Sequence, residues 1–347
     1  MMQQLLRGRL LYILLATLTL LLYARTISGG YALPPEEELP VPAAAAGAEW
    51  TLERWDAHAL QRAVQQKPHL AMWLSLGSAV AGGLGLGGLF LTVQGLWTGR
   101  LRSFWRIPAA PLPAWTFGEL GRIILLILVI AGLMPFVRLA LLSWKPTWEL
   151  DHRLWMTLAM LLLDSFAAMA ILTFAQGKRG SVWNAAGAPG RQAPRWISLG
   201  LRSYVTAFPW LFLLLFAVVE IARVFNVQPP VEPIHELLFR EHRPAVFAMT
   251  LLLACAIGPL AEELFFRGVI YTAIRRKTSR WPAMLISGGV FAGIHTNLIG
   301  FLPITLLGCL LAYLYERTGS LVAPLAVHMF HNTLLMAFAM LYRQLSL

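Results

Sequence analysis

The sequence predicts an all-α protein, a polytopic transmembrane helical bundle with about eight or nine spans. Of its 347 residues, 58% are apolar and only 13% are charged, whereas soluble domains are roughly 45–50% apolar and about 25% charged. The mean hydropathy is +0.64. The apolar residues form runs that approach the ~20 residues of a spanning helix, and basic residues cluster beside these runs.

Each span is predicted from one apolar run. The expected spans are 10–23, 71–97, 123–142, 154–174, 204–219, 245–272, 281–301, 302–315 and 321–341. The first run follows Arg7 and Arg9 and has the length of a signal peptide. Because no small-residue cleavage site follows it and Arg25 comes directly after, we expect an uncleaved anchor.

The placement of lysine and arginine predicts the orientation. With a cytoplasmic N-terminus, the inner side receives the clusters around Arg100, around Arg191 and around Arg276, and holds more basic residues than the outer side. The longest polar segment, residues 26–70, is then an external loop. We expect an integral membrane protein of a bacterial inner membrane. The net charge of +11 is scattered rather than gathered on one face, so it does not predict a nucleic-acid partner.

Two further patterns are better explained by packing than by chemistry. Gly83–Gly88 fits G-x-G-x-x-G, but it lies inside an expected span and has no preceding strand, so a nucleotide site is excluded. Gly83 and Gly87 are expected to allow close helix contacts. Cys255 and Cys309 lie in apolar runs without a C-x-x-C pair, which argues against a zinc knuckle or a disulfide framework.

Ionisable residues inside the expected spans require a reason, because each costs roughly 2.5–3.5 kcal/mol near a bilayer centre. Asp164 stands alone in its run, and we expect it to make a structural hydrogen bond to a neighbouring helix. The last hundred residues differ, since three consecutive runs each contribute polar side chains. These are Glu262, Glu263, Arg267, His295, His328, His331 and Asn332. A shared polar site between helices would let them satisfy one another.

Helical geometry divides this set. Glu263 and Arg267 are four residues apart and face each other, while Glu262 lies about 100° round the helix and can point into a cavity. Pro259 is expected to loosen the preceding turn. His328 and Asn332 are also four apart and can point at one spot.

Water activation is the chemistry that fits these residues. A buried carboxylate can act as a general base, so Glu262 and His295 suit the activation of water. His328 and Asn332 suit donation to a developing oxyanion. The set predicts hydrolysis of an amide without a protein nucleophile.

Three motifs carry a resemblance to a known family. Glu262-Glu263-Leu-Phe-Phe-Arg267 resembles its E-E-x-x-x-R motif, Phe291-Ala-Gly-Ile-His295 its F-x-x-x-H motif, and His328-Met-Phe-His-Asn332 its H-x-x-x-N motif. They occur in the order of the CPBP (Abi) family, the CAAX prenyl proteases and bacteriocin-processing relatives. The resemblance covers roughly residues 245–341.

The resemblance implies an all-helical intramembrane endopeptidase. It assigns water activation to Glu262 and His295, an oxyanion site to His328 and Asn332, and supporting roles to Glu263 and Arg267. Residues 245–341 would form the catalytic core and 1–244 an N-terminal transmembrane region. No cofactor is favoured, but zinc is possible, since Glu262, His295 and His328 could also ligate a metal. The substrate would be a membrane protein or a lipidated peptide, and the oligomeric state stays open.

Two other classes of protein share some of these features. A proton-coupled transporter also uses inward-facing carboxylates and histidines, although the first half of the chain has no repeated polar site. A non-catalytic scaffold that binds a partner helix would use the polar residues to lock helices together. Zinc proteases with H-E-x-x-H on a helix are excluded because that motif is absent.

Overall fold

The computed structural model describes residues 9–27, 65, 68–99, 112, 114–145, 150–176, 192–227, 241–295 and 297–346. These described residues form nine helical rods and no strand, which confirms the expected all-α bundle. Almost all of the predicted external loop 26–70 lies outside the described residues.

The rods follow the apolar runs of the sequence. They are α2 (Arg9–Ile27), α4 (Pro68–Trp97), α6 (Phe117–Trp144), α7 (His152–Ala175), α9 (Ala193–Val224), the continuous rod α11–α13, α14 (Arg280–Ile294), α15 (Phe301–Thr318) and α16 (Val322–Ser346). Side-chain caps set two of the starts. Thr116 forms a capping box with Glu119 at α6, and Asp151 accepts from the N–H of Leu154 at α7.

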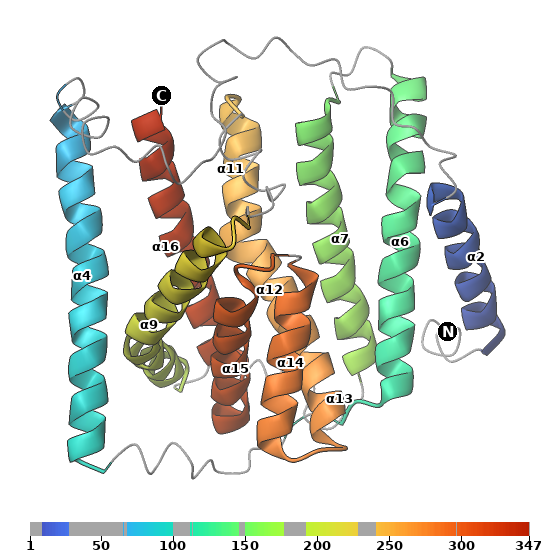
Figure 1. The fold of residues 1–347 in the computed structure, drawn as a ribbon. Coiled ribbons are helices and arrows are strands. Elements are labelled where there is room, and N and C mark those ends of the chain that lie inside the picture. Colours follow the sequence, from blue (N-terminus) through green and yellow to red (C-terminus); the bar gives the residue numbers. More distant parts are fainter. Residues whose placement is uncertain are drawn as a thin grey trace.

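Successive long helices run in alternate directions across the bundle (Figure 1). Six rods are long and apolar enough to cross a membrane: α4, α6, α7, α9, α11–α13 and α16. Their outward faces keep large apolar side chains exposed, such as Leu86, Phe90 and Phe212. A surface of this kind is suited to lipid, and the chain is an integral membrane protein.

The expected spans 281–301 and 302–315 form a short hairpin instead of two full crossings. The 15 residues of α14 reach about 22 Å, less than the ~30 Å hydrocarbon core. In Figure 1, α14 rises from the lower end to the level of α12, and α15 returns to the same end. The helix α14 ends at Ile294, with His295 as its C-cap, and this end of the helix lies at the level of α12 in Figure 1.

The rod from Pro244 to Arg275 is irregular in its middle. It consists of α11 (Pro244–Leu252), the π-helical η2 (Leu253–Ile257), α12 (Gly258–Glu263), the π-helical η3 (Leu264–Tyr271) and α13 (Thr272–Arg275). Pro259 has no N–H, so the turn before it is loosened, as the sequence predicted. The two wide segments flank Glu262 and Glu263, and such bulges are frequent at functional sites.

The core lies where the hairpin meets its neighbours. Its largest fully buried side chains include Trp115, Tyr204, Phe266, Phe291 and Tyr315. The predicted packing role of Gly83 is wrong, because a Cβ there would meet no atom of the described residues within 4 Å. Gly88 is the close-contact residue, since a Cβ there would clash with Val205 and Pro209 of α9.

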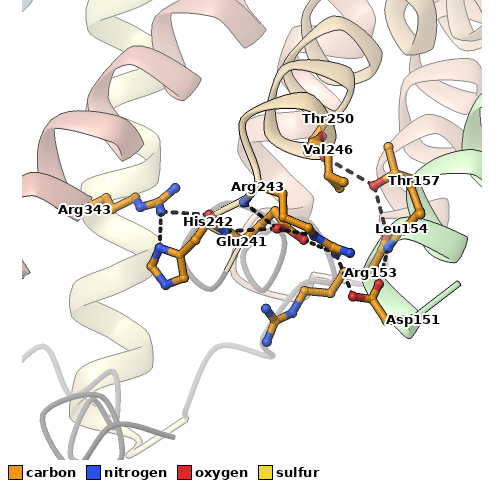
Figure 2. Close-up of polar contacts among 10 residues, drawn as sticks. All are labelled: Asp151, Arg153, Leu154, Thr157, Glu241, His242, Arg243, Val246, Thr250 and Arg343. Carbon is orange, nitrogen blue, oxygen red and sulfur yellow. Dashed lines mark hydrogen bonds and ion pairs between the residues drawn. The ribbon is translucent and has the colours of Figure 1, made fainter. Parts of the chain in front are cut away.

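A charged cluster joins the starts of α7 and α11 to the end of α16 (Figure 2). These three helix ends lie at the upper end of the bundle in Figure 1, whereas α14 starts at the lower end. Glu241 accepts from Arg243 Nε at 2.9 Å and from Arg243 Nη2 at 2.7 Å, and Arg243 Nη2 also lies 2.7 Å from Asp151 at the start of α7. Arg343 of α16 donates to the Glu241 carbonyl at 2.8 Å. The cluster therefore holds the ends of α7, α11 and α16 together.

Candidate active site

Glu263, Arg267 and His328 form a buried chain of polar contacts. Arg267 Nη1 lies 2.7 Å from Glu263 Oε1, and His328 Nδ1 lies 2.8 Å from the same oxygen. All three side chains are almost fully buried. The Arg267–Glu263 pair compensates two charges that would each be costly alone. These polar contacts join α16 to the α11–α13 rod.

The polar contact with Glu263 orients the imidazole of His328. An ionised Glu263 can only accept hydrogen bonds, so Nδ1 of His328 must carry the proton that it shares with Glu263. The other nitrogen, Nε2, then faces Glu262, whose Oε2 lies 3.5 Å away. Glu262 is half-buried, unlike Glu263. The two glutamates therefore differ as the helical geometry predicted: the side chain of Glu263 is buried, whereas that of Glu262 is 30% exposed.

Phe291 links the two predicted histidines. Its ring centroid lies 4.8 Å from that of His295 and 5.6 Å from that of His328. Arg267 Cζ stands 4.6 Å from the same ring. His295 Nδ1 lies 2.8 Å from the carbonyl oxygen of Phe291. When Nδ1 donates there, Nε2 of His295 is the nitrogen left for chemistry.

Asn332 donates a hydrogen bond to a backbone carbonyl that Pro259 leaves without a donor. The N–H of Gly258 donates to Leu253 five residues back, so in the same register Ala254 would receive the N–H that Pro259 lacks. Asn332 Nδ2 donates to this Ala254 carbonyl at 2.9 Å. A primary amide has two N–H groups, so one remains for another acceptor.

Close packing of two glycines brings the hairpin to Arg267. A Cβ on Gly308 would lie 2.8 Å from Gly288 Cα, so only glycine fits this crossing of α14 and α15. Arg267 Nη2 donates to the Gly308 carbonyl at 3.2 Å. The short hairpin that carries His295 is therefore anchored to the buried ion pair.

The alternative zinc site is not matched by this geometry. In the described ranges, no three His, Cys, Asp or Glu side chains are grouped closely enough to hold a metal ion. Glu263, the acid nearest His328, is already engaged by Arg267. The metal-free chemistry itself stays a prediction.

The sequence did not predict the contacts of two residues, Asp164 and His331. It expected a structural hydrogen bond from Asp164 to a neighbouring helix, but within the described part of the chain that carboxyl makes none. Asp164 instead lies beside Gly258, close to Glu262. His331 received no role, and it lies 2.9 Å from the Tyr204 hydroxyl of α9 through Nδ1. Only the isolated charge in an apolar run signalled Asp164, and the sequence could not show its neighbour.

Comparisons with known proteins place the site within a family segment. Residues 244–334 match the family model described as type II CAAX prenyl endopeptidase Rce1-like. YdiL of Bacillus subtilis, named only as a candidate membrane peptidase, is 34% identical over 85 residues, which are 24% of this chain and 35% of that protein. A 24.3 kDa protein of Escherichia coli is 30% identical over 114 residues, 31% of this chain and 52% of its own length.

The likeness is confined to a part of each protein. YpbD of Bacillus subtilis is 36% identical over 89 residues, 24% of this chain and 40% of that protein. The chain thus matches only about a third to a half of the length of these relatives. No solved structure matches the chain. The residues that match the Rce1-like family model, 244–334, include all three motifs of the CPBP resemblance.

Proposed function

We propose that this protein is an intramembrane endopeptidase that hydrolyses a peptide bond of a membrane-associated or lipidated protein. The observation that carries the proposal is the contact chain from Arg267 through Glu263 and His328 to Glu262, at distances of 2.7, 2.8 and 3.5 Å. Its outer end is a half-buried carboxyl, the group that a water-activating site requires.

The reaction needs no covalent intermediate with the protein. Glu262, helped by His295, takes a proton from water while the water oxygen bonds to the carbonyl carbon of the substrate. The negative oxygen that forms accepts hydrogen bonds from the second N–H of Asn332 and from Nε2 of His328, which must then carry a proton as Nδ1 does. The C–N bond then breaks, and the proton held by Glu262 goes to the leaving amine.

The half-depth hairpin supports a site inside the bilayer. The helix α14 ends at the level of α12 (Figure 1), and His295 is the C-cap residue at this end. We propose residues 245–341 as the catalytic core, with the N-terminal region 1–244 surrounding it. A bacterial inner (cell) membrane is the location that we also propose.

The test is to trap the substrate with Glu262→Gln. This variant keeps the shape of the side chain but cannot accept the proton, so uncut substrate should accumulate and co-purify with it. Glu220→Gln on α9, the same change in another helix, is the control and should leave cleavage intact. If the protein is a carrier, the wild type gives no cleavage product and Glu262→Gln loses uptake. If it is a scaffold, the wild type and Glu262→Gln behave alike.

A further inference from the structure

Asp164 is a carboxyl at membrane depth that the proposed reaction leaves unused. It is the one acidic residue of α7, and its side chain is half-buried. Among the described residues, no hydrogen bond or ion pair satisfies it. A carboxyl in a spanning helix is costly unless it has a partner or a task.

Gly258 places this carboxyl beside Glu262. A Cβ built on Gly258 would lie 3.6 Å from Asp164 Oδ2 and 3.9 Å from Glu262 Oε1. Gly258 and Glu262 are four residues apart and share one face of α12. Oxygens from α7 and α12 therefore both lie next to Gly258, together with the Leu253 carbonyl oxygen, which would be 3.0 Å from such a Cβ.

The other charged groups nearby are already engaged. Arg267 pairs with Glu263, and His328 Nε2 faces the Oε2 oxygen of Glu262. In the described ranges no donor reaches Oε1 of Glu262, which is the oxygen nearest Gly258. A carboxylic acid has an O–H donor and a carboxylate oxygen accepts, so an acid form of Asp164 would supply a donor for this oxygen.

We propose that Asp164 is a positioning residue for Glu262. In its acid form it donates a hydrogen bond to Glu262 Oε1, directly or through one water, and so holds that carboxylate toward the water that it activates. The inference rests on the proposed peptidase function. It adds to the site a helix that lies outside the family segment 244–334.

The test uses substitutions that keep or remove the donor. Asparagine has the shape of a protonated aspartate and keeps an N–H donor, so Asp164→Asn should retain most of kcat. Asp164→Leu removes the donor and should lower kcat by about 10–100-fold, the loss expected for a hydrogen bond to a charged group. KM should change little for either variant, because the substrate does not touch Asp164. Ser165→Ala, at the exposed neighbouring position, is the control and should match the wild type.

Purified variants are compared in liposomes with the trapped substrate, after thermal melting has shown that each is folded. Asp164→Ala replaces the leucine variant if that one does not fold. Wild-type kcat in the leucine or alanine variant would overturn the positioning role, and so would an asparagine variant as slow as the leucine one. Cleavage by Glu262→Gln in the same assay would instead refute the proposed function itself, so the two failures can be told apart.

Discussion

At the scale of single residues, the site depends on one buried ion pair. Arg267 neutralises Glu263, which in turn orients His328, and Phe291 stands between Arg267 and both histidines. None of these partners is exposed to water except His295, which is only half-buried. A buried charge that loses its partner here cannot be solvated by water, so changing one partner affects the others.

We therefore expect Arg267→Met to destabilise the protein by about 3–5 kcal/mol, the usual cost of leaving a buried charge unpaired. The double variant Arg267→Met with Glu263→Gln should lose less, because the orphan charge is gone. Thermal unfolding in detergent measures both. A double variant less stable than the single one would contradict this reading of the pair.

At the scale of elements, the half-depth hairpin depends on the contact between Gly288 and Gly308. Gly308→Ala should push α14 and α15 apart and break the bond from Arg267, at a cost of about 1–3 kcal/mol for overpacking. Cleavage should fall as well, because His295 moves with α14. Melting temperature and cleavage rate are the measurements.

Gly289→Ala is the matched control for this substitution, since a Cβ there would have no neighbour within 4 Å in the part of the chain that the structure describes. It should be neutral or slightly stabilising, because alanine favours helix more than glycine does. Equal effects of the two substitutions would show that the crossing is looser than described.

The helix-end cluster gives a pH dependence. Hydrogen bonds from Arg243 hold the pKa of Glu241 at about 2, well below its ordinary 4.5. A lowered folded-state pKa stabilises the folded protein above pH 4.5, and this stabilisation fades as the pH falls toward the folded value. We expect Glu241→Gln to be less stable near neutral pH by about 1–3 kcal/mol. Its stability should also fall less on acidification, as melting curves recorded between about pH 3 and 7 would show. Parallel pH curves for the variant and the wild type would rule out this role.

At the scale of the whole molecule, successive helices run in opposite directions between the two ends of the bundle (Figure 1). Arg275 and Arg317 lie in the last turns of α13 and α15, and Arg223 and Arg343 lie in the last turns of α9 and α16. In Figure 1, α13 and α15 finish at the lower end of the bundle and α16 finishes at the upper end. With the N-terminus cytoplasmic, a cysteine at Lys277 should react only with membrane-permeant reagents in intact cells. A cysteine at Arg223 should react with impermeant ones. The reverse labelling would invert the proposed orientation.

The apolar runs predicted the rods and their order, because hydrophobic length alone identifies spanning helices. The motif spacing predicted the Glu263–Arg267 pair and the different directions of Glu262 and Glu263. The sequence did not predict the half-depth hairpin, because an apolar run that forms a short helix resembles one that forms a full span. It also missed that Asn332 caps Ala254 and that Asp164 adjoins Glu262, since both depend on contacts between residues distant in the chain.

Cleavage of a single peptide bond by the purified protein is the most direct measurement of the central claim. Wild type, Glu262→Gln and Glu220→Gln are each placed in liposomes with the trapped substrate, and mass spectrometry follows the new termini. The account predicts one cut for the wild type and for Glu220→Gln, and none for Glu262→Gln. Equal cleavage by all three proteins, or by none of them, would contradict a peptidase that depends on Glu262.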